Sequence, residues 1–214
     1  LKPSLYGSLA AVFAQVPVVI NALAGLGYVF TSAEAYARVL RPVVLTAFRV
    51  LFGRDNTRVI FQNADDRALL VGLGVVPEGR TALIRGAGVD IETFHVVPMP
   101  DGVPQVVFPA RMLWDKGLHE FVDAARLLKG EGCKARFVLA GEPDPHNPAS
   151  ADEAVLRQWV ADGLVEWRGR RDDMPLVFQG AAVVCLPSYR EGLPKVLLEA
   201  AACGRPIVAT DVPG

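Results

Sequence analysis

The chain has 214 residues, of which 22 are Lys or Arg and 23 are Asp or Glu. About half are apolar (51%), which allows a packed core and excludes disordered, collagen-like and disulfide-stapled chains. The net charge of −1 argues against a dedicated nucleic-acid binder, which would carry a basic surplus. Cys133, Cys185 and Cys203 are far apart and form no C-x-x-C pair, so we expect three small buried hydrophobes in a reducing compartment.

Charge is unevenly distributed along the chain. Residues 1–60 hold six basic and two acidic side chains, net +4, so the remainder carries −5. This asymmetry predicts two regions with different partners. No charge occurs from Pro3 to Ala33, but Gly7, Pro17 and Gly25 interrupt that stretch. It therefore predicts a helix, a buried strand and a Gly-rich loop rather than a membrane span, which needs an apolar run of about 18 residues.

The first half of the chain alternates helical and short apolar segments. The pattern predicts helices over 4–15, 33–52 and 64–72. The strands that follow them are predicted over 17–21, 58–62 and 81–85. A polar stretch rich in Pro, 97–104, then breaks any regular element and is the best candidate linker.

A second alternation begins after this linker. Strands are predicted over 105–109, 135–140, 164–167, 182–186 and 206–209. The helices between them are predicted over 117–129, 151–162, 174–180 and 194–203. Short continuous apolar strands, each followed by a helix, are typical of parallel sheets covered on both faces. The predicted class is α/β, doubly wound, in two lobes, with ligands beyond the carboxyl ends of the strands.

Polar residues follow two of these predicted strands. Arg111 and Lys116 come after strand 105–109 and flank a loop that opens a helix, an arrangement that suits a diphosphate. The alternative is a pair of solvated surface charges. Gly141 follows strand 135–140 and would permit close approach of a ligand, or it belongs to an ordinary turn.

The strand over 182–186 leads to a further candidate anion site. Pro194 is expected at the first helical position, where its missing N–H costs nothing. The amides of Gly192 and Leu193 would then point out of the helix start and bind an anion. Glu191, just before that start, is either a ligand contact or a plain cap.

Glu199 lies on the second turn of this helix among apolar residues. A carboxylate in such surroundings needs partners. A sugar diol would supply them by donating two hydroxyls. The alternative is a buried ion pair with Arg205 or another base.

Residues 191–210 resemble the signature of retaining GT-B glycosyltransferases of family 4. That signature is Glu191, seven residues, Glu199, then small-x-Gly-x-Pro-Ile-Val-Ala-Thr. The pair Arg111…Lys116 matches the phosphate clamp of the same family. Segments 2–7 and 21–30 are similar to the bacterial branch that extends polyprenyl-diphosphate-linked sugars of surface polysaccharides and glycans.

The resemblance implies a GT-B-like fold of two Rossmann-like lobes, the first and last parts of which are truncated here. Residues 1–102 would form a partial N-terminal acceptor lobe. Residues 103–214 would form a C-terminal donor lobe without its end. A fragment of this kind is not expected to turn over on its own.

The family also implies roles for the candidate residues. Arg111 and Lys116 would hold the diphosphate and, with Glu191, form the catalytic set. Glu199 would hold the ribose, and Arg170, within Trp167–Arg171, lies where the base is held. The remaining donor-binding positions would contact the sugar and its phosphate or line the site: Gly141, Glu191, Gly192 and Leu193.

The function implied is transfer of a sugar from a nucleoside-diphosphate donor, a UDP-sugar, to a lipid-linked saccharide with retention. No D-x-D motif or metal-ligand spacing is present in the sequence, so neither a metal nor a cofactor is expected. The alternatives are a sugar-nucleotide 2-epimerase and a non-catalytic sugar-nucleotide-binding module. The expected location is cytoplasmic, peripheral on the inner face of the membrane.

Helix 33–52 motivates that membrane contact. Arg38, Arg41 and Arg49 fall on one stripe of the predicted helix, beside apolar residues. A basic stripe next to apolar surface suits a helix lying in a membrane interface. The alternative is that Pro42 kinks the helix and its apolar residues face the sheet.

Overall fold

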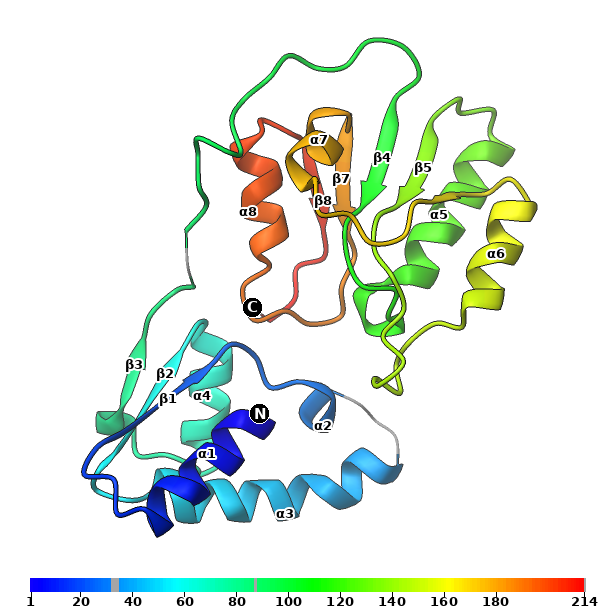
Figure 1. Ribbon diagram of the computed structural model, residues 1–214. Coiled ribbons are helices and arrows are strands. Elements are labelled where there is room, and N and C mark those ends of the chain that lie inside the picture. Colours follow the sequence, from blue (N-terminus) through cyan, green and yellow to red (C-terminus); the bar gives the residue numbers. More distant parts are fainter. Residues whose placement is uncertain (32–34, 87, 214) are drawn as a thin grey trace. The chain divides into compact units, whose positions relative to one another are not determined.

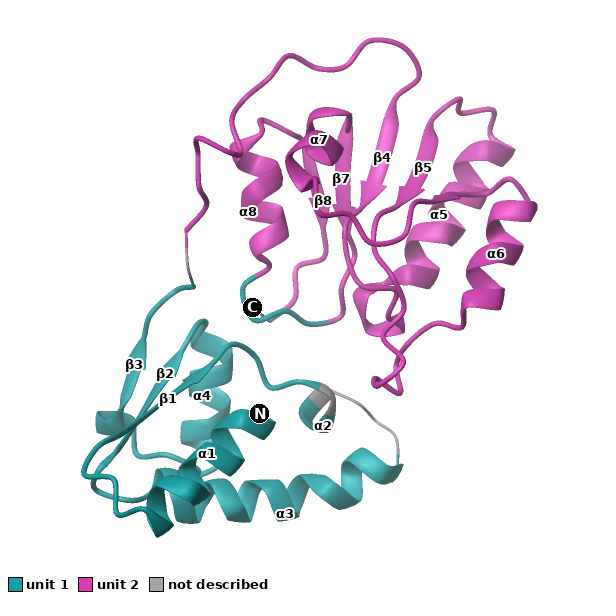
Figure 2. Ribbon diagram, in the orientation of Figure 1, with its two compact units in different colours: residues 1–86, 190–193, 213–214 teal, residues 87–189, 194–212 magenta. Residues whose placement is uncertain are grey.

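The computed structural model describes residues 1–31, 35–86 and 88–213 (Figure 1). The chain divides into two compact units, which are described separately here (Figure 2). Unit 1 comprises residues 1–86, 190–193 and 213–214, and unit 2 comprises residues 87–189 and 194–212. The predicted linker, 97–104, is part of unit 2.

Unit 1 is built around a parallel three-stranded sheet of order β1-β2-β3. Its strands are β1 (Val19–Leu23), β2 (Thr57–Phe61) and β3 (Thr81–Leu83). Its helices are α1 (Lys2–Phe13), α2 (Tyr28–Thr31), α3 (Ala35–Phe52), α4 (Ala64–Gly72) and the 3-10 turn η1 (Glu78–Arg80). Positions 33 and 34 of the predicted helix 33–52 lie outside the described residues. The short helix α2 occupies part of the segment that was predicted to be a Gly-rich loop.

The core of unit 1 lies on one face of this sheet. Alternate residues of β2, Val59 and Phe61, are fully buried there and pack with side chains of α3. Two of these, Phe48 and Phe52, stack with ring centroids 4.5 Å apart. On the opposite face, Ile20 of β1 is 64% exposed, so the strand that was predicted to be buried is covered on one face only. The covered face follows the period-2 alternation expected of strands.

Unit 2 contains a parallel five-stranded sheet of order β6-β5-β4-β7-β8. Its strands are β4 (Gln105–Phe108), β5 (Arg136–Leu139), β6 (Glu166–Trp167), β7 (Val183–Leu186) and β8 (Ile207–Ala209). The connecting helices are η2 (Trp114–Lys116), α5 (Leu118–Gly130), α6 (Glu153–Ala161), α7 (Met174–Gln179) and α8 (Lys195–Ala202). Because β4 lies between β5 and β7, the strand order reverses there, which creates the crevice where doubly wound sheets bind ligands.

Both faces of this sheet are covered, as the continuous apolar strands predict. Phe108 and Leu139 belong to one buried cluster, which includes side chains of α5 and α6. Their neighbours Val107 and Val138 belong to the other cluster, which includes side chains of α7 and α8. The sequence therefore predicted the α/β class, the parallel strands and the layers of unit 2 correctly.

Two further local expectations, the start of α8 and the burial of the cysteines, are wrong. Helix α8 begins at Lys195, so Pro194 is its N-cap rather than its first helical residue. Cys133 is exposed, whereas Cys203 is buried and Cys185 is half-buried. Cys133 follows the end of α5, where no element covers it, so only the two cysteines beside the sheet behave as core residues.

Candidate functional site

The loops that follow β4 and β7 contact each other directly. Gly117 adopts a φ of 77°, and a Cβ there would lie 2.0 Å from the Pro187 carbonyl oxygen. The backbone N–H of Tyr189 donates to the Asp115 carbonyl at 3.0 Å. Only glycine fits position 117. Because glycine has no side chain, the Arg111–Lys116 segment can lie directly against the loop after β7.

A cavity of 460 Å³ lies at the carboxyl ends of β4 and β5. Three of the predicted site residues, Arg111, Gly141 and Arg170, line it together. Several residues without a predicted role also line it: Glu142, Asp144, Met174 and Val196. Asp144 stands between two prolines in the loop that follows a predicted strand, a signal that could have marked it.

Arg111 forms an ion pair within this cavity. Its Nη1 donates to Asp144 Oδ2 at 2.6 Å. The Arg111 side chain is 58% exposed and that of Asp144 is 27% exposed. Arg111 therefore combines an exposed guanidinium with a carboxylate partner at a strand end.

Gly141 follows β5 and packs so closely against the residues after β4 that a side chain would not fit. A Cβ at this position would lie 1.9 Å from the Ala110 carbonyl oxygen. Its own carbonyl accepts a hydrogen bond from Trp167 Nε1 at 2.8 Å. Close approach to a ligand is thus not needed to explain the glycine, although the residue does line the cavity.

The arginines of the predicted base-binding segment are divided between two environments. Arg170 lies at the cavity and pairs with Asp172 at 3.2 Å. Arg171 lies there too and pairs with Asp173. The Arg171 guanidinium holds the pKa of the Asp173 carboxyl below its ordinary value.

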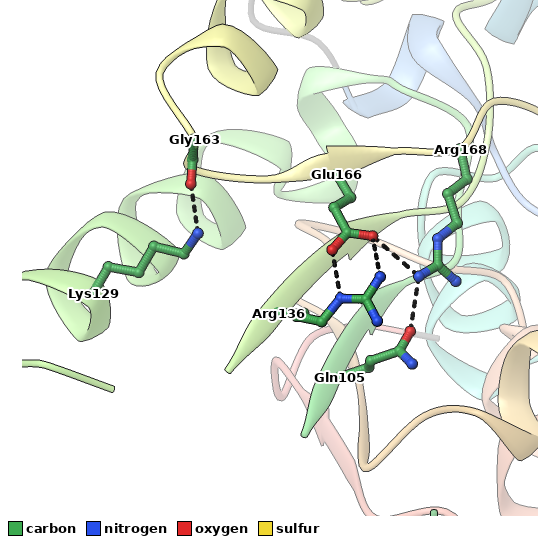
Figure 3. Close-up of polar contacts among 6 residues, drawn as sticks. All are labelled: Gln105, Lys129, Arg136, Gly163, Glu166 and Arg168. Carbon is green, nitrogen blue, oxygen red and sulfur yellow. Dashed lines mark hydrogen bonds and ion pairs between the residues drawn. The ribbon is translucent and has the colours of Figure 1, made fainter. Parts of the chain in front are cut away.

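Arg168 instead points toward the first residues of β4, β5 and β6 (Figure 3). It donates to Gln105 Oε1 at 2.9 Å and to Glu166 Oε2 at 3.1 Å. Arg136 Nε donates to the same Glu166 carboxylate at 2.6 Å. Arg136, hydrogen-bonded to that group, holds the pKa of Glu166 below its ordinary value. Arg168 is thus part of a polar network and does not line the cavity.

Lys116 and Glu199 lie in unit 2 but do not line this cavity. Lys116 is half-buried at the end of η2. The Glu199 side chain is 13% exposed and pairs with Lys195 at 3.2 Å. The predicted alternative, an ion pair with a base, is thus present, with Lys195 as the base. Arg205 instead donates to the carbonyl of Val97 at 2.6 Å and to other backbone carbonyls.

Glu191, Gly192 and Leu193 group with unit 1 by their contacts. Asn63 Nδ2 donates to the Gly192 carbonyl at 2.9 Å, and a Cβ on Gly192 would lie 2.0 Å from the Ala24 carbonyl oxygen. Unit 2 therefore contains five of the eight predicted site residues, namely Arg111, Lys116, Gly141, Arg170 and Glu199.

Metal binding requires a cluster of ligating side chains, and membrane crossing requires a long apolar helix. Among the described residues, no group of three or more His, Cys, Asp or Glu side chains could hold a metal ion. Within the same ranges, no helix has both the length and the apolar character that crossing a bilayer requires.

Comparison with known proteins identifies the family of the part of the chain that contains this cavity. The family model described as glycosyl transferases group 1 matches residues 103–214, which include β4–β8 and the whole cavity. The N,N'-diacetylbacillosaminyl-diphospho-undecaprenol alpha-1,3-N-acetylgalactosaminyltransferase of Campylobacter jejuni is 31% identical over the entire chain, which covers 57% of that relative. An Escherichia coli UDP-Gal:alpha-D-GlcNAc-diphosphoundecaprenol alpha-1,3-galactosyltransferase is 23% identical, again over the entire chain and 56% of the relative.

Solved structures agree on the fold. Anabaena HepE in complex with UDP and glucose superposes with a TM-score of 0.74 at 21% identity, over all of this chain and 58% of HepE. WaaG, a lipopolysaccharide glycosyltransferase, gives a TM-score of 0.74 at 16% identity over 98% of this chain and 64% of WaaG. The fold is thus that of GT-B glycosyltransferases, and the chain spans little more than half the length of these relatives. With its second half matched throughout, the chain belongs to the glycosyl transferases group 1.

Proposed function

We propose that the protein containing this chain transfers a sugar from a UDP-sugar to a lipid-linked saccharide, with retention of the anomeric configuration. The observation that carries the proposal is that Arg111 lines a cavity at the carboxyl ends of β4 and β5, within the family-matched residues. According to their names, the two relatives above act on diphospho-undecaprenol-linked sugars, and the HepE structure contains UDP. The product would be an extended lipid-linked glycan of a surface polysaccharide.

Leaving-group charge is the central requirement of this reaction. When the donor's glycosidic bond breaks, negative charge develops on the departing nucleoside diphosphate. Arg111 and Lys116 would stabilise that charge electrostatically, without a metal, from fixed positions on the loop before α5. The acceptor hydroxyl then attacks the same face of the sugar that the diphosphate leaves.

The remaining residues would hold the rest of the donor. Glu199, which is 13% exposed, would exchange its contact with Lys195 for two ribose hydroxyls. Arg170, which lines the cavity together with Gly141, would hold the base. Glu191, with the amides of Gly192 and Leu193, would contact the sugar and its phosphate.

Nucleotide binding by this chain tests the clamp. Arg111→Ala and Lys116→Ala should each weaken UDP binding about 10- to 100-fold, because each removes a charge-assisted contact. The measurement is isothermal titration calorimetry. Arg126→Ala, which removes an exposed arginine paired with Asp123 on α5, is the control and should bind UDP like the wild type. Unchanged affinity in both clamp variants would contradict the assignment.

Kinetics of the whole protein separate the two glutamates. Glu199→Gln should mainly raise the KM for the donor, because the ribose contact exists before the reaction. Glu191→Gln should mainly lower kcat, because this residue acts nearer the departing sugar. The opposite pattern would exchange the two roles.

Product analysis distinguishes the reactions open to this architecture. The whole protein, a panel of UDP-sugars and a polyprenyl-diphosphate-linked saccharide should give a new glycosidic bond, detected by mass spectrometry. NMR of the product should show the anomeric configuration of the donor. A changed sugar nucleotide without transfer would identify a 2-epimerase, and binding without any product would identify a binding module.

The lipid-linked acceptor requires contact with a membrane surface, and unit 1 offers one. Two arginines of the stripe predicted on α3 donate to backbone carbonyls: Arg41 to Val29 at 2.9 Å, and Arg49 to Leu73 at 2.9 Å. The contact that we propose therefore uses the exposed apolar side chains of the two helices. These are Tyr6, Leu9 and Phe13 of α1 and Tyr36, Val39, Val43 and Val50 of α3.

A groove of 700 Å³ runs between these two helices, lined by residues such as Leu5, Pro42 and Ala47. Pro42 lies within α3, which continues past it to Phe52. Apolar surface of this extent, on a half of the chain that carries net +4 over residues 1–60, suits an anionic bilayer. The protein would then lie on the cytoplasmic face of the membrane that presents its acceptor.

Liposome co-sedimentation tests this contact. The whole protein should bind vesicles containing anionic lipid, and Val43→Glu/Val50→Glu on α3 should abolish binding. Arg38→Glu should only weaken it, since one exposed cation near the bilayer contributes about 1 kcal/mol. Leu127→Glu, which charges an exposed apolar position of α5, is the control. Binding that survives the double substitution would leave α3 outside the contact.

A further inference from the structure

Asp144 places a negative charge inside the cavity that is proposed to receive a diphosphate. Its Oδ2 accepts from Arg111 Nη1 at 2.6 Å, and both residues line the cavity. A carboxylate at this position repels any anionic ligand and occupies one donor group of the arginine that would bind it.

The loop that carries Asp144 is fixed to the loop that carries Arg111. The Met112 N–H donates to the Glu142 carbonyl at 3.0 Å, and the Ala151 N–H donates to the Met112 carbonyl at 2.8 Å. Between them, the Trp114 N–H donates to the Ala149 carbonyl at 2.8 Å. The β5–α6 connection therefore forms a strap across the Arg111 segment.

Asp144 is also held individually within this strap. Its own N–H donates to Ser150 Oγ at 2.9 Å, and its Oδ1 accepts from the His146 N–H at 3.2 Å. Arg111, by contrast, is 58% exposed and has a long side chain. When an anion enters the cavity, Arg111 can change partner while Asp144 stays in place.

We infer that Asp144 is the resting counter-ion of Arg111 and a positioning residue that sets the affinity and charge selectivity of the donor site. The inference rests on the proposed function, because it assumes that Arg111 binds the donor's diphosphate. When the diphosphate binds, it must replace Asp144 as the partner of the Arg111 guanidinium, while the Asp144 carboxylate remains in the cavity. Only a ligand with a strongly anionic group at that point gains from the exchange, so an uncharged nucleoside gains nothing from Arg111.

Asp144→Asn tests this inference with little structural cost. Asparagine keeps a side-chain oxygen for the His146 N–H but removes the charge. We expect UDP to bind about three- to tenfold more tightly and uridine to bind as in the wild type, since an exposed ion pair and its repulsion are of this size. Raising NaCl from 0.1 to 0.5 M should shrink the gain, because salt screens exposed charges. In the whole protein, the donor KM should fall and kcat should stay unchanged.

Asp123→Asn is the matched control, because Asp123 pairs with Arg126 on the exposed surface of α5. Calorimetry on Arg111→Ala, Asp144→Asn and the double variant completes a cycle, and the gain from Asp144→Asn should be smaller when Arg111 is absent. UDP affinity that is unchanged or lower in Asp144→Asn, or a gain equal in both backgrounds, would overturn the inference. Unchanged affinity in Arg111→Ala would instead refute the diphosphate clamp, so the two failures are distinguishable.

Discussion

The arginines of α3 in unit 1 and those around the cavity of unit 2 are the same residue type in two different roles. On α3, Arg41 and Arg49 donate to backbone carbonyls of neighbouring segments. At the cavity, Arg111 and Arg170 pair with the side-chain carboxylates of aspartates. An arginine that moves away from a backbone carbonyl leaves that oxygen without its donor. A phosphate, by contrast, can take the place of a carboxylate beside the guanidinium, so the cavity arginines are the better suited of the two groups to exchange partners with an anion.

The largest effect is expected at Gly117, on which the loop carrying the cavity arginine depends. Gly117→Ala should lower the free energy of unfolding by about 2–5 kcal/mol, through a left-handed φ and a clash with the Pro187 carbonyl. Urea unfolding measures it. Gly132→Ala is the matched control, because Gly132 has a φ of +84° but nothing within 4 Å of its Cβ position. Equal losses in the two variants would show that the contact between the loops contributes nothing.

Arg205 tests whether the carbonyl-bound role belongs to α3 alone. This unit 2 arginine is 3% exposed and donates to the carbonyls of Val97 and Pro98 in the predicted linker. Arg205→Met should cost about 2–4 kcal/mol, because partly buried carbonyls lose a charged donor. Limited proteolysis should show faster cleavage in 97–104. Arg126→Met provides the baseline for an exposed arginine, and cleavage at the wild-type rate would exclude the anchoring role.

A pair of substitutions on α3 sharpens the comparison further. Arg41→Ala should destabilise unit 1 by about 1–2 kcal/mol, since its donors to Val29 and Phe30 are lost. Arg38→Ala, at an exposed position, should stay within about 0.5 kcal/mol of the wild type. Thermal unfolding compares the two. Equal effects would mean that the carbonyl contacts of α3 are not structural.

The smallest effect concerns an arginine–carboxylate pair away from the cavity. Arg136 holds the pKa of Glu166 below its ordinary value, so the pair stabilises the fold above the unfolded pKa, about 4.3. Both side chains are more than two-fifths exposed, so Glu166→Gln should cost only about 0.5 kcal/mol at pH 7. The difference from the wild type should vanish as the pH falls through the lowered folded pKa. A difference that persists there would point to packing rather than charge.

Backbone features of the fold were predictable from the sequence, and side-chain partners were not. Apolar runs at β4, β5 and β7 fixed the strands, and glycines such as Gly117 and Gly141 marked their ends. The helical wheel placed Arg41 and Arg49 on one stripe but could not say that carbonyls of α2 and the end of α4 would lie beside them. Such contacts depend on tertiary packing between segments distant in sequence.

The candidate site shows the same division. Strand-end placement found Arg111 and Gly141, and the family resemblance found Arg170; the structure brings all three to one cavity. Prolines on both sides of Asp144 mark its loop in the sequence, but they do not show that backbone hydrogen bonds pair this loop with the Arg111 segment, which is what brings the carboxylate to Arg111. The glycines also mislead in one respect: Gly141 is forced by the Ala110 carbonyl, so a glycine at a strand end does not by itself indicate a ligand.

The hydrogen bond from Trp167 to the Gly141 carbonyl has an optical consequence. It attaches one of the chain's three indoles to the wall of the cavity. Indole emission shifts with local polarity and is quenched by stacked bases, so a nucleotide entering the cavity would change the fluorescence of Trp167. Replacing Trp114 and Trp159 with Phe would leave Trp167 as the single tryptophan, whose emission would report occupancy of the cavity without any added label.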